Sequence, residues 1–194
     1  MRVRRLGWAA VEVEAAGATA VIDLVADFGS MERLVGPPRE PLSSPSRPGA
    51  TRVAMVTHMH RDHADPGAIT AALSPVGVLL RPERTTGTGT ELAMTADAET
   101  DLNELGVTAR TVAAWDSVTV GPFELTAVPS ADGFGDNQVG WVVAADGHRI
   151  VHYGDTLFHG WWWAARQRVG PFEIAFVPAN GPIVDIPPYQ PSSP

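Results

Sequence analysis

The sequence predicts an α/β layered domain, because short apolar runs alternate with segments that have helix signals. An apolar run over 53–57 precedes a polar loop, and a second run covers 76–80. Between them Asp65 and Pro66 have the residue types of an N-cap and a first helical position. A longer helix is expected over 91–106, where Gly106 ends it. Strands and helices in this alternation are typical of sheets covered by helices, so we expect a single α/β domain over 1–194.

The remaining strands are expected on both sides of this region. Two strand-like runs within 10–25 flank a turn at Gly17. Asp146-Gly147 predicts a second tight hairpin turn. The second half of the chain is richer in strands, which we expect over 117–120, 123–129, 138–145, 149–154 and 172–178, with a helix over 160–169.

Two segments are rich in proline, serine and glycine. Residues 29–50 are predicted to form a long loop. Residues 179–194 end in PIVDIPPYQPSSP, and proline fits neither a helix interior nor a central strand. We therefore expect a loosely ordered tail there.

Composition excludes several kinds of chemistry. The chain has 194 residues and no cysteine, so any metal site must use nitrogen and oxygen ligands. Its net charge of −8 argues against nucleic acid as a partner. Apolar runs are too short for a transmembrane segment, and Glu12 and Glu14 interrupt any signal peptide. We expect a cytoplasmic protein with a small-molecule substrate, and homo-oligomerisation is left open.

Three of the six histidines lie together in THMHRDH, residues 57–63, directly after a predicted buried strand. His58 and His60 are two residues apart, so in an extended chain both point to the same side and can bind one ion. The following turn brings Asp62 and His63 toward a second position. Imidazole and carboxylate without sulfur suit Zn²⁺, Mn²⁺ or Fe. The sequence therefore predicts a metal centre.

This motif resembles the H-x-H-x-D-H signature of the metallo-β-lactamase-fold hydrolases. The resemblance extends to the early GWAAVEVE…AVIDL segment and to Tyr153-Gly154-Asp155-Thr156. The layout is most similar to the branch of the L-ascorbate-6-phosphate lactonase-like proteins and the N-acyl-phosphatidylethanolamine phospholipases D. It implies a four-layer αβ/βα sandwich, here expected to lack its C-terminal helix and strand.

The resemblance also implies a ligand set and an activity. Of the two divalent ions, Zn²⁺ is the first candidate and Mn²⁺ or Fe the alternatives. His58, His60 and Asp132 would hold one ion, Asp62 and His63 the other, and Asp155 would bridge both. The implied function is a metal-dependent hydrolase using a metal-bound hydroxide on a small ester, lactone or phosphodiester. Asp62 and Asp155 would be the catalytic carboxylates.

The sequence departs from the family pattern at several positions. Asp132 stands where a third histidine is usual, so it is either a ligand or a turn residue beside Gly133, and Asp136 is a competing candidate. The last family histidine has no counterpart, and His159 is interpreted as a contact to a ligand or substrate, or as a packing residue. Trp8 replaces a common histidine, which is expected to remove a polar group. The alternative function is a degenerate or truncated relative with weak metal binding and no catalysis.

Overall fold

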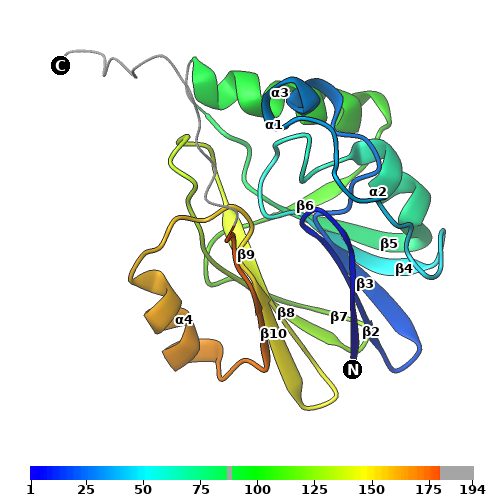
Figure 1. The fold of residues 1–194 in the computed structure, drawn as a ribbon. Coiled ribbons are helices and arrows are strands. Elements are labelled where there is room, and N and C mark those ends of the chain that lie inside the picture. The colour runs from blue at the N-terminus through cyan, green and yellow to red at the C-terminus, as the bar shows by residue number, and fades with distance from the viewer. Residues whose placement is uncertain (87–88, 180–194) are drawn as a thin grey trace.

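Two β-sheets pack face to face in the computed structural model, which describes residues 1–86 and 89–179 (Figure 1). In spatial order the first sheet contains β1 (Arg2–Gly7), β2 (Ala10–Ala15), β3 (Ala18–Ile22), β4 (Thr51–Met55), β5 (Leu73–Pro82) and β6 (Ala109–Val112). The second contains β11 (Ile174–Phe176), β10 (His148–His152), β9 (Val139–Ala145), β8 (Phe123–Pro129) and β7 (Ser117–Val120). The helices are η1 (Gly29–Met31), α1 (Glu32–Val35), α2 (Pro66–Ala72), α3 (Thr90–Glu104) and α4 (Trp161–Val169).

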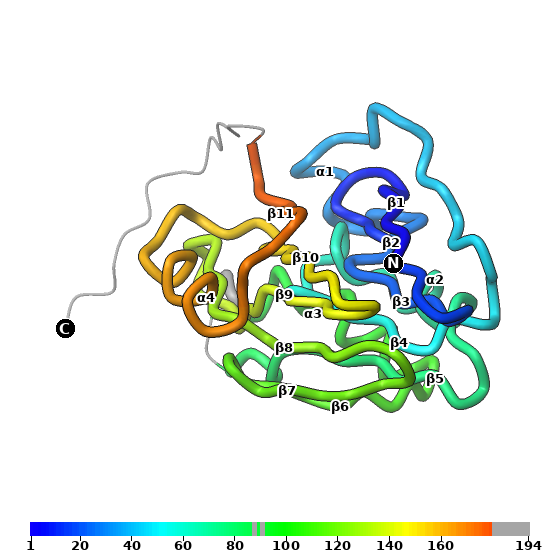
Figure 2. Tube along the Cα trace, turned by 90° about the horizontal axis from the view of Figure 1, so that it is seen from below, coloured from blue at the N-terminus to red at the C-terminus, as the bar shows by residue number. Residues whose placement is uncertain are grey.

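The elements form four layers, as predicted. The main core lies between the sheets, where Met55 and Leu80 of the first sheet belong to one buried cluster with Trp141 of the second. A second apolar cluster joins α2 and α3 to the outer face of the first sheet, and a third joins α4 to the outer face of the second. Figure 2 shows α4 and α2 on opposite sides of the two sheets. Each sheet thus buries both faces.

Both predicted hairpin turns are confirmed. Ala16 and Gly17 join β2 to β3 with φ values of 44° and 76°, and Asp146 and Gly147 join β9 to β10 with 52° and 78°. Two consecutive residues with positive φ match the right-handed twist of an antiparallel hairpin. The predicted start of α2 is also confirmed, because the Asp65 side chain accepts the Ala68 N–H at 3.1 Å.

Some elements differ from the sequence prediction. β1 was not expected because its arginines resemble a basic terminus, but Arg4 pairs with the buried Glu12 of β2 at 2.9 Å. The short edge strand β6 was also missed, and β11 is shorter than the expected strand over 172–178. The expected loop over 29–50 begins with η1 and α1 and has no other helix or strand.

The rest of that segment is fixed to the first sheet. Ser46 donates its backbone N–H to Glu12 at 2.7 Å, and Ser43 donates its backbone N–H to the carbonyl of Leu6 at 2.6 Å. The tail predicted over 179–194 lies outside the described residues from 180 onward. Within the described ranges, no helix is long and apolar enough to cross a membrane.

Candidate metal centre

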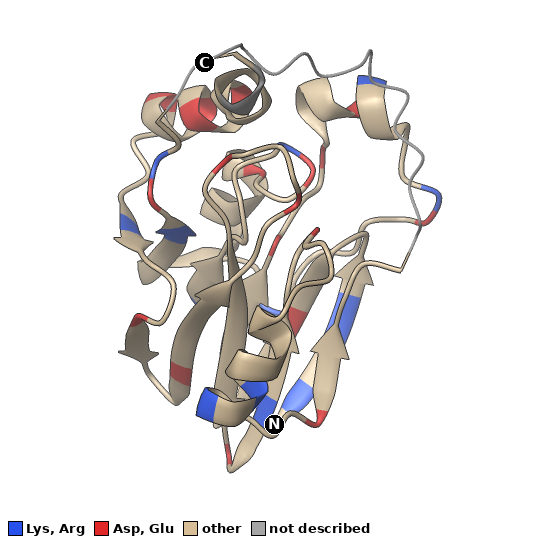
Figure 3. Ribbon diagram, turned by 90° about the vertical axis from the view of Figure 1, so that its left-hand side faces the viewer, with Lys and Arg blue, Asp and Glu red and all other residues tan. Residues whose placement is uncertain are grey.

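The candidate centre lies where the loops after β4, β8 and β10 meet. Two hydrogen bonds fix the end of β4 against the second sheet: Val139 donates its N–H to the carbonyl of Thr57, and Trp141 Nε1 donates to the carbonyl of Val56, both at 2.9 Å. Figure 3 shows acidic positions in the loops at the end of the sheets away from the N-terminus. The sandwich therefore brings together loops that are far apart in sequence.

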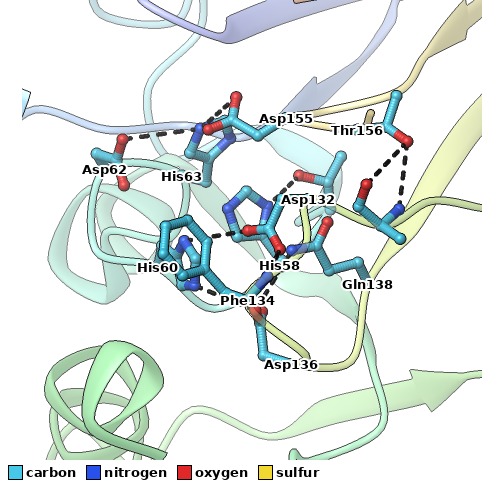
Figure 4. A network of polar contacts seen from close by, with 12 residues as sticks. His58, His60, Asp62, His63, Asp132, Phe134, Asp136, Gln138, Asp155 and Thr156 are labelled. Carbon is cyan, nitrogen blue, oxygen red and sulfur yellow. Dashed lines mark hydrogen bonds and ion pairs between the residues drawn. The ribbon is translucent and has the colours of Figure 1, made fainter. Parts of the chain in front are cut away.

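The three motif histidines form one buried group. The ring centroid of His58 lies 4.4 Å from that of His60 and 4.2 Å from that of His63, and all three residues are at most 3% exposed. Around them lie Asp62, Asp132, Asp136 and Asp155 (Figure 4). The loop after β4 thus supplies the nitrogen atoms, while the loops after β8 and β10 add carboxylates.

Two sets of three residues have potential ligand atoms within 4.8 Å of one another. One set is His58, His60 and Asp132, and the other is His58, His63 and Asp155. His58 therefore lies between the two sets. Asp62 is outside both sets, but its Oδ2 lies 3.8 Å from His63 Nε2. Every motif residue named from the sequence is thus in the same cluster of side chains.

The two carboxylates after β8 face different nitrogens of His60. Asp132 Oδ2 lies 3.8 Å from Nδ1, whereas Asp136 Oδ1 lies 3.3 Å from Nε2. The other oxygen of Asp132 accepts the backbone N–H of Phe134 at 2.7 Å. The two aspartates therefore have different geometric relationships to the same ring.

The residues fit divalent ions, because many of their buried polar atoms have no hydrogen-bond partner. These atoms are Nε2 of His58, His60 and His63, Oδ1 of Asp62, and Oδ2 of Asp132 and Asp136. Buried polar atoms are normally paired, since an unpaired one costs free energy. Nitrogen and carboxylate oxygen are ligands of Zn²⁺, Mn²⁺ and Fe. Divalent ions bound in this cluster would give the ligating atoms the partners that they lack.

Two hydrogen bonds leave Nε2 of His58 and His63 as the free nitrogens. Thr57 Oγ1 donates to Asp23 Oδ2 at 2.8 Å, so this hydroxyl accepts from His58 Nδ1, which lies 2.9 Å away. His63 Nδ1 donates to Asp23 Oδ2 at 2.9 Å. A hydrogen bond at one ring nitrogen fixes the tautomer and leaves the other nitrogen for a metal.

Burial and neighbouring charges shift the pKa values of the cluster. Burial lowers the pKa of His58, and His63 and His60 add to this effect. Burial opposes the protonation of His63, but the carboxylates of Asp155, Asp62 and Asp23 raise its pKa well above the usual value. Burial likewise opposes ionisation of Asp155, yet His63 holds its pKa below the usual range. Burial raises the pKa of Asp132. Burial thus favours the neutral form of His58, whereas His63 and Asp155 each favour the charged form of the other.

Asp23 and Thr57 are functional candidates that the sequence analysis missed. Asp23 follows β3, is fully buried, and also accepts the backbone N–H of Thr57 at 2.7 Å. It contacts the metal motif at Thr57 and His63, which lie 34 and 40 residues away in sequence. The signal that could have found it is an acidic residue at the end of an apolar strand.

Trp8 corrects one expectation, because it does bring a polar group to the site. It lies on the turn between β1 and β2, and its Nε1 donates to Asp62 Oδ2 at 3.2 Å. His159 has no contact with the aspartates in the described structure; its Nε2 lies 2.9 Å from Thr156 Oγ1 and its ring packs on Trp162. Thr156 in turn bonds the backbone N–H of Ala131 at 3.2 Å, which joins the loops that carry Asp155 and Asp132.

Gly154 allows Asp155 to approach the histidines. Its φ is +62°, and a Cβ at this position would lie 2.5 Å from Thr57 Oγ1. The loop after β10 therefore passes directly over the end of β4. As a result Asp155 Oδ1 lies 3.3 Å from His63 Nε2.

Comparison with known families agrees with this geometry. The family model described as a beta-lactamase superfamily domain matches residues 19–183. The chain belongs to the beta-lactamase superfamily. The match includes the histidine motif and Asp155. No curated protein sequence matches the chain.

Several solved structures are similar in fold to this chain. CmlA, a diiron beta-hydroxylase from Streptomyces venezuelae, has a TM-score of 0.65 at 19% identity, over 88% of this chain and 33% of its own. A Parabacteroides distasonis protein assigned as a metal-dependent hydrolase has a TM-score of 0.63 at 17% identity, and the match covers 94% of this chain and 71% of that protein. Isothiocyanate hydrolase from Delia radicum gut bacteria has a TM-score of 0.55 at 16% identity, and the match covers 87% of this chain and 67% of the hydrolase. The chain thus spans a third of the length of CmlA.

Proposed function

We propose that this beta-lactamase superfamily protein is a metal-dependent hydrolase of a small ester, lactone or phosphodiester. The observation that carries the proposal is the pair of buried, unpaired Nε2 atoms of His58 and His63 beside the unpaired carboxylate oxygens of Asp62 and Asp132. Family membership supports it, as do two structural neighbours, the Parabacteroides distasonis protein assigned as a metal-dependent hydrolase and the isothiocyanate hydrolase. Divalent ions in such a centre would activate water near neutral pH and stabilise negative charge developing on a carbonyl or phosphoryl oxygen.

The ligand distances suit two ions. Two atoms that each lie about 2.0–2.2 Å from one Zn²⁺ are at most about 4.4 Å apart. The separation of His63 Nε2 from Asp155 Oδ1 is 3.3 Å, and that from Asp62 Oδ2 is 3.8 Å. We assign one ion to His63, Asp62 and Asp155, with Asp155 as the bridge to the second. Zn²⁺ is the first candidate, with Mn²⁺ or Fe as alternatives.

We assign the second ion to His58, His60 and Asp132. Asp132 belongs to the set with both histidines, and its unpaired Oδ2 faces Nδ1 of His60. Asp136 is at the opposite nitrogen, so in this assignment it holds the ring in place and is not a ligand. A carboxylate next to a ligating histidine fixes ring orientation and increases ligand basicity.

The chain's own carboxylates would then have distinct tasks. Asp155 is half exposed, so of the carboxylates around the histidines it is open to a substrate from solvent. Asp62 is buried and would hold its ion and orient the attacking water. The remaining backbone around the centre keeps the three histidines in a fixed arrangement, which reduces reorganisation during the reaction.

Metal analysis of the purified protein tests the proposal. Metal-free protein is reconstituted separately with Zn²⁺, Mn²⁺ and Fe²⁺, dialysed, and measured by mass spectrometry. We expect about two ions per chain for the preferred metal, as in two-metal hydrolases. The absence of bound metal after every reconstitution would contradict the assignment and favour the degenerate, non-catalytic alternative.

An activity screen with lactone, ester and phosphodiester substrates then separates the substrate classes. His60→Ala is expected to abolish any hydrolysis that the wild type shows. His148→Ala is the matched control, because that histidine is exposed at the start of β10. Activity that survives in His60→Ala would show that the site is wrongly assigned.

A further inference from the structure

Trp8 reaches the candidate metal centre from the turn between the edge strand β1 and its neighbour β2. The turn between β1 and β2 places it with φ values of +111° at Gly7 and +50° at Trp8. Its ring packs on Phe28 with centroids 4.8 Å apart, and Phe28 belongs to a buried apolar cluster. The indole therefore has a fixed location beside the loop that carries the metal motif.

We propose that Trp8 is a positioning residue that holds Asp62 in place for the ion assigned to His63 and Asp155. The inference rests on the proposed metal centre. The contact that carries it is the hydrogen bond from Trp8 Nε1 to Asp62 Oδ2 at 3.2 Å. The same oxygen lies 3.8 Å from His63 Nε2, so the indole contacts the carboxylate oxygen that faces this histidine.

The hydrogen bond matters because the Asp62 carboxylate accepts no other hydrogen bond from the described residues. Its second oxygen, Oδ1, is buried and unpaired, and the residue is only 2% exposed. Without the indole N–H, the carboxylate would be free to rotate about its Cβ–Cγ bond. Fixing it before the ion binds reduces the entropy lost on binding, which raises affinity.

A purely structural role for Trp8 makes a different prediction. The contact with Phe28 alone would contribute to stability and would leave metal affinity unchanged. The N–H donor and the ring can be separated by chemistry. Replacing Trp8 with 3-benzothienylalanine keeps the two fused rings but exchanges the N–H for sulfur. Trp8→Phe removes the donor with a natural residue.

Zn²⁺ titration of the metal-free protein tests the inference, with competing chelators to resolve each binding step. In both Trp8 variants we expect the affinity for one of two ions to fall about 10–100-fold, and the other to change little. Trp163→Phe is the matched control, because Trp163 is 70% exposed on α4 and its substitution should change neither step. Thermal unfolding of each metal-free variant shows whether the fold is retained.

The outcomes separate the two proposals. If the wild type binds two ions and the benzothienylalanine variant binds both with wild-type affinity, Trp8 does not position Asp62. If the wild type binds no Zn²⁺, Mn²⁺ or Fe²⁺, the metal centre itself is refuted. A loss of affinity for one ion, with the metal-free fold intact, supports the inference.

The indole N–H resonance gives a second readout that needs no metal. The chain has six tryptophans, and the resonance of Trp8 is identified by its loss in Trp8→Phe. We expect Asp62→Asn to shift this resonance more than the other five, because it changes the acceptor of the hydrogen bond. An unchanged Trp8 resonance in Asp62→Asn would overturn the inference.

Discussion

Asp23 Oδ2 lies 2.9 Å from Nδ1 of His63, and both side chains are buried. The same carboxylate accepts both the N–H and the hydroxyl of Thr57, whose oxygen contacts His58. One aspartate at the end of β3 therefore orients two histidines of the candidate centre. Carboxylates with this role are typically worth 10–100-fold in metal affinity.

Substitution of Asp23 should weaken metal binding and the fold together. Asp23→Asn places an amide N–H₂ group opposite one of its donors, which leaves buried groups unpaired. We expect the free energy of unfolding of the metal-free protein to fall by about 1–3 kcal/mol, and the metal affinity to fall about 10–100-fold. Denaturant unfolding and Zn²⁺ titration measure the two effects.

Asp146→Asn is the control for this substitution, because Asp146 lies in the exposed turn between β9 and β10 and pairs with the N-terminus. It should change metal affinity little. Equal metal affinities in wild type and Asp23→Asn would mean that Asp23 does not orient His63 for metal binding.

Gly154→Ala should displace Asp155 from His63. The new Cβ would lie 2.5 Å from Thr57 Oγ1, so the loop after β10 must move. Gly147→Ala is the matched control: Gly147 also has a positive φ, of 78°, but nothing lies within 4 Å of its Cβ position. Both variants have backbone strain, and only the first has a clash.

We expect Gly154→Ala to be less stable than Gly147→Ala by about 1–3 kcal/mol, the usual cost of overpacking. It should also bind both ions more weakly, because Asp155 is assigned as the ligand that bridges them, whereas Gly147→Ala should keep both with unchanged affinity. Thermal unfolding and metal content provide the measurements. Similar stability and metal content in the two variants would show that the approach of Gly154 to Thr57 is not needed.

Asp132 and Asp136 should differ in their effect on metal stoichiometry. Asp132 faces Nδ1 of His60, whereas Asp136 faces Nε2. An ion bound to one of these nitrogens can therefore have only one of the two aspartates as a further ligand. We expect Asp132→Ala to lose one of two ions, and Asp136→Ala to keep both with about 10–100-fold weaker binding of one. The reverse result in metal analysis would exchange the roles of the two aspartates.

The local parts of this fold could be predicted from the sequence. Both hairpin turns have short sequence signatures. The histidines directly follow an apolar run, and this run is enough to place them at the end of a buried strand. β1 could not be recognised, because the ion pairs that make its arginines compatible with a strand come from residues such as Glu12 and Glu40 elsewhere in the chain. Short edge strands such as β6 lack a buried face to signal them.

The support around the centre required the structure. The bond from Asp23 to His63 spans 40 residues and that from Trp8 to Asp62 spans 54, and no local pattern encodes either. The motif specified which residue types meet, but the ring nitrogen that faces Asp132 or Asp136 depends on how the loop after β8 packs on His60. Sequence therefore predicted the cluster, and tertiary packing determines the orientation of its members.

Metal removal should lower the thermal stability of the protein. The unpaired nitrogens and oxygens of the centre are buried, and an ion that binds only the folded state stabilises it by mass action. At a metal concentration about a thousand times Kd this is about 4 kcal/mol. For a domain of this size we expect Tm to fall by about 10 °C after chelation.

Calorimetry with and without EDTA makes this measurement, and readdition of Zn²⁺ or Mn²⁺ should restore Tm. His58→Ala is the best control, because His58 belongs to both sets of potential ligands. In that variant chelation should change Tm much less than in the wild type. If EDTA lowered Tm equally in both proteins, the stabilising ions would be bound elsewhere, whereas an unchanged Tm in the wild type would argue against a resident metal.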